Sequence, residues 1–95
     1  MPLFLMICHD KPDSLALRMS VRERHLDWIK DRMHLVRFAG PMLNDAGEMQ
    51  GSLFMMDAPD KAAVEGFAAD DPYGKAGLFE RVEICGWRQT VGQSV

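Results

Sequence analysis

The sequence lacks the short motifs that mark several large classes of enzyme. It has no glycine-rich phosphate-binding loop, no Cys-x-x-Cys pair and no His-Glu-x-x-His helix. Its 3 histidines do not follow the spacing of a metal-ligand set. We therefore expect neither a cofactor nor a catalytic metal ion, and we give no weight to a nucleotide-binding function.

Long hydrophobic runs and an excess of positive charge are also missing. No apolar stretch approaches the roughly 18 residues that a membrane helix needs, and no charged leader precedes one at the N-terminus. Lys and Arg number 11 against 14 Asp and Glu, which gives a net charge of −3. That balance disfavours nucleic acid or an anionic membrane as a partner. We expect a cytoplasmic protein.

Cysteine is scarce as well, with only Cys8 and Cys85. Without a secretory signal the compartment is expected to be reducing, so both cysteines are predicted to be free thiols. The 95 residues are 47% hydrophobic and 26% charged, which is typical of one globular domain. We therefore predict a single domain over residues 1–95, ordered to about residue 90, with a frayed tail over 91–95.

Four segments have the composition of β-strands. The first is an unbroken apolar run that stops at His9 and Asp10, which is typical of a strand buried on both faces. Gly40 and Pro41 weaken the second and assign it to a sheet edge or a bulge, because proline has no amide hydrogen for the ladder. Turn residues at 44–47 join the second and third strands into a hairpin. The predicted strands are residues 2–8, 35–43, 50–56 and 78–87.

Two segments are predicted to be helices. The first spans about residues 15–33, and Ser14 is its predicted N-cap, whose hydroxyl accepts a first-turn amide hydrogen. The second begins with Pro59 in its first turn and runs to about residue 69. It ends at residues 70–74, because a residue before proline is pushed out of the helical region.

The resulting order, β-α-β-β-α-β, predicts an α+β fold of the ferredoxin-like kind. This fold has a four-stranded antiparallel sheet with two helices on one face and the first and third strands in the centre. Cys8 and Cys85 then lie in neighbouring strands but several residues out of register, beyond the reach of a disulfide. Because the central strands are apolar on both faces, the uncovered face predicts a homodimer formed through it.

The first helix carries an apolar stripe that contains a single polar residue. Apolar residues at steps of three and four are typical of the buried face of a helix. The stripe consists of Leu15, Met19, Arg22, Leu26, Ile29 and Met33.

His25 lies beside this stripe, on a flank that also carries Arg18, Arg22 and Arg32. The flank is predicted at the border between core and solvent, where the wall of a pocket can form. Two interpretations stay open from the pattern. His25 is either a boundary residue on a solvated arginine-rich face or a residue that transfers protons.

The segment Asp70-Asp71-Pro72-Tyr73 is the second candidate. Its plain interpretation is a helix terminator followed by a tyrosine that packs. Its functional interpretation is a carboxylate that hydrogen-bonds one imidazole nitrogen and leaves the other free for proton transfer. The spacing leaves open whether His25 meets Asp71, and His9 and His34 receive no role.

Several short motifs follow one another along the chain: Arg22-Glu23-Arg24-His25-Leu26, Ala39-Gly40-Pro41, Gly51, Asp70-Asp71-Pro72-Tyr73 and Ala76-Gly77-Leu78. Taken together, they resemble the YCII-related domain family. The resemblance extends over nearly the whole chain and implies a ferredoxin-like subunit of the dimeric α+β barrel group.

The resemblance also implies a function. The family is similar to small proteins proposed as enzymes with a His-Asp pair, which here maps to His25 and Asp71. Arg22 lies one turn before His25 and suits the binding of a carboxylate or an enolate-like oxygen, because a buried cation needs a partner. Tyr73 would position the substrate. Relatives with this barrel include isomerases, monooxygenases and dehydrohalogenating enzymes.

We therefore expect a cofactor-independent isomerase or dehydrohalogenase-like lyase that acts on a small anionic or phenolic molecule. One alternative is a dimeric ligand-binding or interaction module without catalysis. A third interpretation, a haem-dependent or oxygen-using relative, fits the superfamily, but no residue of the sequence demands it.

Overall fold

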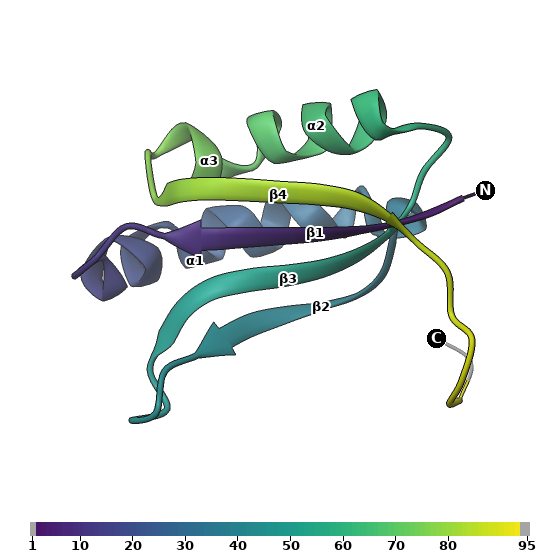
Figure 1. The fold of residues 1–95 in the computed structure, drawn as a ribbon. Coiled ribbons are helices and arrows are strands. Elements are labelled where there is room, and N and C mark those ends of the chain that lie inside the picture. The colour runs from purple at the N-terminus through teal and green to yellow at the C-terminus, as the bar shows by residue number, and fades with distance from the viewer. Residues whose placement is uncertain (1, 94–95) are drawn as a thin grey trace.

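The computed structural model, described here for residues 2–93, has one antiparallel sheet with its helices packed against one face (Figure 1). The strand order is β2-β3-β1-β4, so the first and third strands are central. The predicted ferredoxin-like α+β fold is confirmed. The elements in chain order are β1 (Leu3–Asp10), α1 (Leu15–Lys30), the 3-10 turn η1 (Met33–Leu35), β2 (Val36–Leu43), β3 (Met49–Asp57), α2 (Lys61–Asp70), α3 (Pro72–Lys75) and β4 (Phe79–Trp87).

The apolar side chains of β1, which pairs with β3, alternate between the two faces of the sheet. Met6 lies opposite Phe54, and both are buried against the helices. Val64 and Phe67 of α2 complete this main core. Alternate side chains point to opposite faces of a strand, so Leu5 lies on the open face, where it is only half-buried.

A smaller cluster ties the middle of α1 to α3 and to the residue before β4. It consists of the buried residues Val21, Tyr73 and Leu78. It holds Tyr73, which is only 2% exposed, next to the middle of α1.

The hairpin follows the prediction made from Gly40 and Pro41. β2 is an edge strand, and its pairing with β3 shifts register twice, between Val36 and Phe38 and again between Met42 and Leu43. The missing amide hydrogen of Pro41 is therefore tolerated at the edge of the sheet.

The helix ends differ from the predictions. α1 stops at Lys30, and the predicted last turn becomes η1. Ser14 occupies the N-cap position, but its hydroxyl donates to the carbonyl of Pro12 and accepts no first-turn amide hydrogen. α2 begins at Lys61, after Pro59, because the carboxylate of Asp60 accepts the amide hydrogen of Ala63.

The segment predicted only to end the second helix forms a further short helix, α3. Pro72 occupies its first turn, where the absence of an amide hydrogen costs nothing. Asp71 is its N-cap, with φ −57° and ψ 129°. The non-helical conformation that proline imposes on the preceding residue thus separates α2 from α3.

The predicted buried stripe of α1 is wrong. The buried residues of the helix are Arg18, Val21 and His25, at steps of three and four. Met19 is 51% exposed and Arg22 is exposed as well. The helix therefore turns two polar side chains inward, where they meet the partners described below.

Cys8 and Cys85 are free thiols, as predicted, and lie three positions out of register because Cys8 pairs with Val82 and Cys85 with Leu5. Val91, in the tail predicted to be frayed, lies outside any strand and is 84% exposed. Residues 92–93 are exposed as well, and residues 94–95 of the predicted tail lie outside the described residues. Over residues 2–93, no helix is long and apolar enough to cross a membrane.

Gly51 lies where the two central strands, β1 and β3, approach each other closely. A Cβ atom added to Gly51 would lie 2.6 Å from the carbonyl oxygen of Cys8 and would also collide with Met42. We expect Gly51→Ala to lower the free energy of unfolding by about 1–3 kcal/mol, measured by urea denaturation. Gly86→Ala is the matched strand control, since a Cβ there meets no described atom within 4 Å. Equal effects of the two substitutions would contradict this account.

Candidate functional site

A cleft of about 290 Å³ lies between α1 and the β2–β3 side of the sheet. One wall comes from α1 and carries Arg22 and His25, and the opposite wall comes from the hairpin and carries Pro41 and Ser52. Tyr73 of α3 closes the cleft from the side. A larger hollow of about 890 Å³ at the hairpin turn includes none of the four predicted site residues in its lining.

A hydrogen bond joins His25 to Asp71 at the inner side of this cleft. His25 Nδ1 lies 2.8 Å from Asp71 Oδ1, and the two residues are 8% and 1% exposed. The same oxygen accepts the amide hydrogen of Tyr73 at 2.9 Å. The N-cap that begins α3 is therefore also the group that holds the imidazole.

This contact fixes which nitrogen of His25 carries a hydrogen. A carboxylate only accepts, so Nδ1–H donates to Asp71, and in the neutral imidazole the lone pair is then on Nε2. Within the described residues Nε2 has no hydrogen-bond partner. Because His25 lines the cleft, Nε2 is the nitrogen available to a bound molecule.

Aromatic rings restrict the imidazole further. The ring of Tyr73 stacks on His25 with 4.2 Å between centroids and 18° between planes. The ring of Phe54 meets it edge-on at 6.4 Å. The histidine is thus held by one hydrogen bond and a stacked ring, which is the kind of support that a precisely oriented proton-transfer group requires.

The second oxygen of the Asp71 carboxylate is buried. This atom, Oδ2, has no hydrogen-bond partner in the described part of the chain. Burial raises the pKa of the nearby Cys8 thiol to about 12, and the negative charges of Asp71 and Asp10 add to the rise. Cys8 therefore stays protonated at neutral pH and is not a nucleophile.

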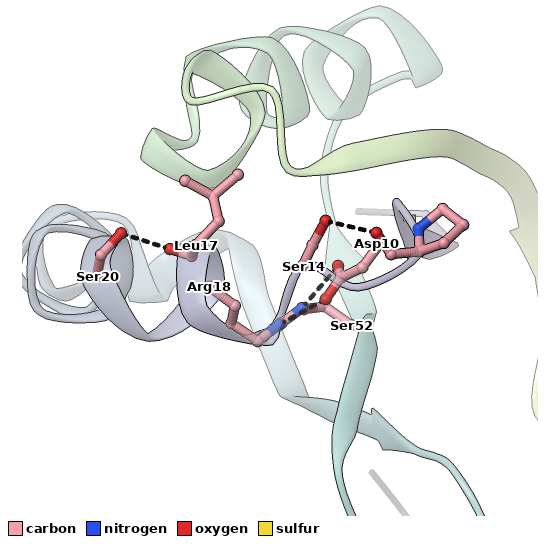
Figure 2. A network of polar contacts seen from close by, with 7 residues as sticks. Asp10, Ser14, Leu17, Arg18, Ser20 and Ser52 are labelled. Carbon is pink, nitrogen blue, oxygen red and sulfur yellow. Dashed lines mark hydrogen bonds and ion pairs between the residues drawn. The ribbon is translucent and has the colours of Figure 1, made fainter.

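A buried ion pair supports the other end of the cleft (Figure 2). Arg18 reaches from α1 to Asp10, with Nε–Oδ2 at 2.8 Å and Nη2–Oδ1 at 3.1 Å, and Nη2 also donates to Ser52 Oγ at 2.8 Å. The side chains of this pair are only 3% and 4% exposed. The guanidinium carbon lies 4.7 Å from the centroid of the Tyr73 ring. Arg18 thereby connects β1 and β3 to the tyrosine that stacks on His25.

The predicted buried arginine was therefore the wrong one. Arg22 is exposed at the cleft, and no ion pair involves it among residues 2–93, whereas Arg18 takes the buried place. Burial raises the pKa of Tyr73, and the charges of Arg18 and Arg22 oppose that rise. The spacing carried a signal for Arg18, because it precedes His25 by seven residues and so shares its helix face.

Of the four predicted site residues, Arg22, His25 and Tyr73 line one cleft, and Asp71 is buried and hydrogen-bonded to His25. His9 lies elsewhere, in β1, where its Nε2 is 2.9 Å from Glu83. Within the described residues, no cluster of three or more His, Cys, Asp or Glu is placed to hold a metal ion. The arrangement offers a nitrogen base at Nε2, an unpaired guanidinium and an aromatic wall, which suits a proton transfer on an acidic organic molecule.

Comparison with known proteins gives one family. The YCII-related domain matches residues 2–88. Among curated proteins, Protein YciI of Escherichia coli O6:H1 and Protein YciI of Shigella flexneri are each 35% identical over 91 residues, covering 86% of this chain and 92% of the relative.

Two solved structures share this fold at different levels of sequence identity and structural similarity. The 5-chloro-2-hydroxyhydroquinone dehydrochlorinase TftG from Burkholderia phenoliruptrix, in complex with 2,5-dihydroxybenzoquinone, is 31% identical, with a TM-score of 0.85 over 93% of this chain and 95% of its own. A dimeric ferredoxin-like protein of unknown function from Jannaschia is 12% identical, with a TM-score of 0.50 over 94% and 100%. The second likeness shows the fold alone.

The buried ion pair gives a stability prediction. Asp10→Asn leaves the charge of Arg18 buried without its counter-ion, so we expect it to lower the free energy of unfolding by about 3–5 kcal/mol. Asp27→Asn is the control, because the pair of Asp27 with Lys30 is 76% and 74% exposed. Urea denaturation checks both variants. An Asp10 variant as stable as the Asp27 variant would contradict the proposed importance of the buried pair.

Proposed function

We propose, since this chain belongs to the YCII-related domain family, that its cleft is the active site of a small cofactor-independent enzyme that transfers protons on an anionic or phenolic molecule. The observation that carries the proposal is the hydrogen bond between His25 Nδ1 and Asp71 Oδ1 at 2.8 Å. It leaves Nε2 as a base at the wall of the cleft, beside the unpaired charge of Arg22.

In this proposal His25 and Asp71 are the catalytic residues. His25 Nε2 takes a proton from a substrate hydroxyl, and Asp71 stabilises the imidazolium that forms. Arg22 binds the resulting oxyanion. General acid–base catalysis of this kind contributes about 10²–10⁴-fold, and a positioned donor to an oxyanion about 10²–10³-fold. Tyr73 holds the imidazole by stacking and lines the cleft for the substrate ring.

An elimination of hydrogen chloride fits these groups. The similar protein TftG is a dehydrochlorinase of a chlorinated hydroxyhydroquinone. On such a ring, one hydroxyl loses its proton and the carbon that carries chlorine gains one. A second hydroxyl then loses its proton as chloride leaves with the electron pair of the carbon–chlorine bond. The products are a quinone and HCl, and no external oxidant is needed.

The alternative is a ligand-binding module that uses the same cleft without turnover. The observation that favours it is the burial of His25, which is only 8% exposed and packed among aromatic rings. A histidine in such a site also serves as a plain hydrogen-bonding wall. The two candidates differ in turnover and agree in binding.

We further propose that the protein is a cytoplasmic homodimer. Both cysteines are free thiols, which suits a reducing compartment. The open face of the sheet, opposite the core of α1 and α2, carries the half-buried residues Leu3, Leu5 and Ile7, and β4 adds Trp87 at 37% exposure. Face-to-face packing of two such sheets would remove this apolar surface from water.

The catalytic proposal is tested with 5-chloro-2-hydroxyhydroquinone as substrate and chloride release as the signal. We expect turnover by the wild-type protein, a loss of about 10²–10⁴-fold in His25→Gln and a comparable loss in Asp71→Asn. Binding of 2,5-dihydroxybenzoquinone, followed by isothermal titration calorimetry, should survive in His25→Gln. Met19→Ser, on the exposed side of α1, is the control.

Two outcomes would contradict the proposed catalytic function. Wild-type protein that binds the quinone and releases no chloride would favour the ligand-binding module. A His25→Gln variant with unchanged turnover would exclude His25 as the base.

The dimer is tested by light scattering at micromolar concentration. We expect twice the subunit mass of 10.7 kDa for the wild-type protein. Leu5→Lys places a charge in the centre of the open face and should give monomers, with far-UV circular dichroism to confirm the fold. Ala62→Lys, on the exposed surface of α2, should remain dimeric. A monomeric wild-type protein would disprove the dimer.

A further inference from the structure

The cleft is polar at one end and apolar at the other. Arg18 bonds to Ser52, and Ser52 pairs with Pro41, so the first half of α1 faces the last residues of β2. Ile29, one turn after His25, packs instead against the main core, which includes Val36 at the start of β2, and both residues line the cleft. Helix and strand thus run in opposite directions across the cleft, and the cations gather at one end.

The apolar end is left partly uncovered. Leu26 and Met33 line the cleft and are 38% and 53% exposed. Both belong to the apolar stripe that the sequence predicts for the first helix, with Leu26 in α1 and Met33 in η1, and together with Ile29 they line the cleft. An apolar wall beside a charged and hydrogen-bonding one is the usual make-up of a small-molecule site.

The dimensions exceed those of a bare ring. A cavity of roughly 150 Å³ holds benzene, whereas this cleft has about 290 Å³. From Arg22 to Ile29 the helix rises about 10 Å. A phenol whose oxygen meets Arg22 and His25 would therefore leave the apolar end empty unless it carries a further group.

From this arrangement we infer that the ligand is a phenol or enol with an apolar substituent on the side of the ring opposite its ionisable oxygen. The oxygen lies between His25 Nε2 and Arg22, and the substituent covers Ile29 and Met33. This inference rests on the proposed function for the placement of the oxygen. It adds the polarity and direction of the rest of the molecule.

The test is a series of para-substituted phenols whose dissociation constants are measured by NMR titration at pH 8. From 4-methylphenol through 4-ethylphenol to 4-propylphenol we expect affinity to rise about fourfold per methylene. The polar counterpart 4-(hydroxymethyl)phenol should bind about tenfold more weakly than 4-ethylphenol, because its hydroxyl loses water without gaining a partner.

Variants of the apolar wall test whether the gain in affinity per methylene arises there. Met33→Ser should reduce the gain per methylene to about twofold or less, and Leu26→Ser provides a second alteration of the same wall. Met19→Ser is the matched control, because Met19 is 51% exposed on α1 and lies outside the lining of this cleft. Affinities that do not rise along the series, or a rise that Met33→Ser and Leu26→Ser both leave intact, would overturn the inference.

The readout is binding, so it separates this inference from the proposed function. A steep series in a protein that shows no turnover would refute the enzyme and support the inference. Turnover combined with a flat series would refute the inference and leave the enzyme.

Discussion

The site depends on the carboxylate of Asp71, because one oxygen of that group performs two structural tasks. It accepts the first-turn amide hydrogen of α3 and the Nδ1 hydrogen of His25. Pro72 fixes the backbone before α3, so the carboxylate is already directed when the helix forms. Asp71 thereby determines both where α3 begins and how the imidazole of His25 is oriented. Tyr73 is placed at the site as well, because it comes two residues after Asp71.

Arg18 performs the corresponding task from the other side. A guanidinium that is 3% exposed needs a counter-ion and further hydrogen bonds, and Asp10 and Ser52 supply them. The cation also lies against the ring of Tyr73, which stacks on His25. Two buried carboxylates therefore brace one chain of contacts that runs from Arg18 through Tyr73 to His25.

The sequence predicted the fold well and the inward face of α1 badly, for related reasons. Strand runs, turn residues and the edge signal of Gly40 and Pro41 are local, so the sheet could be read from them. The buried face of α1 is decided by partners that are distant in sequence. His25 and Asp71 are 46 residues apart, and no periodicity records that they meet. The α3 turn was missed because four residues are too few for a periodic pattern.

On α1, polar side chains are buried where the sequence predicts apolar ones, and this bears on the proposed function of the helix. Apolar side chains such as Leu26 remain exposed while Arg18 and His25 are buried, which costs free energy unless the polar groups are paired and the apolar ones are covered by something else. The first condition is met inside the chain by Asp10 and Asp71. In the proposed function, the second is met for Leu26 and Met33 by the molecule in the cleft. On that proposal, Leu26, Ile29 and Met33, which the sequence pattern places in the core, form the apolar half of a binding site.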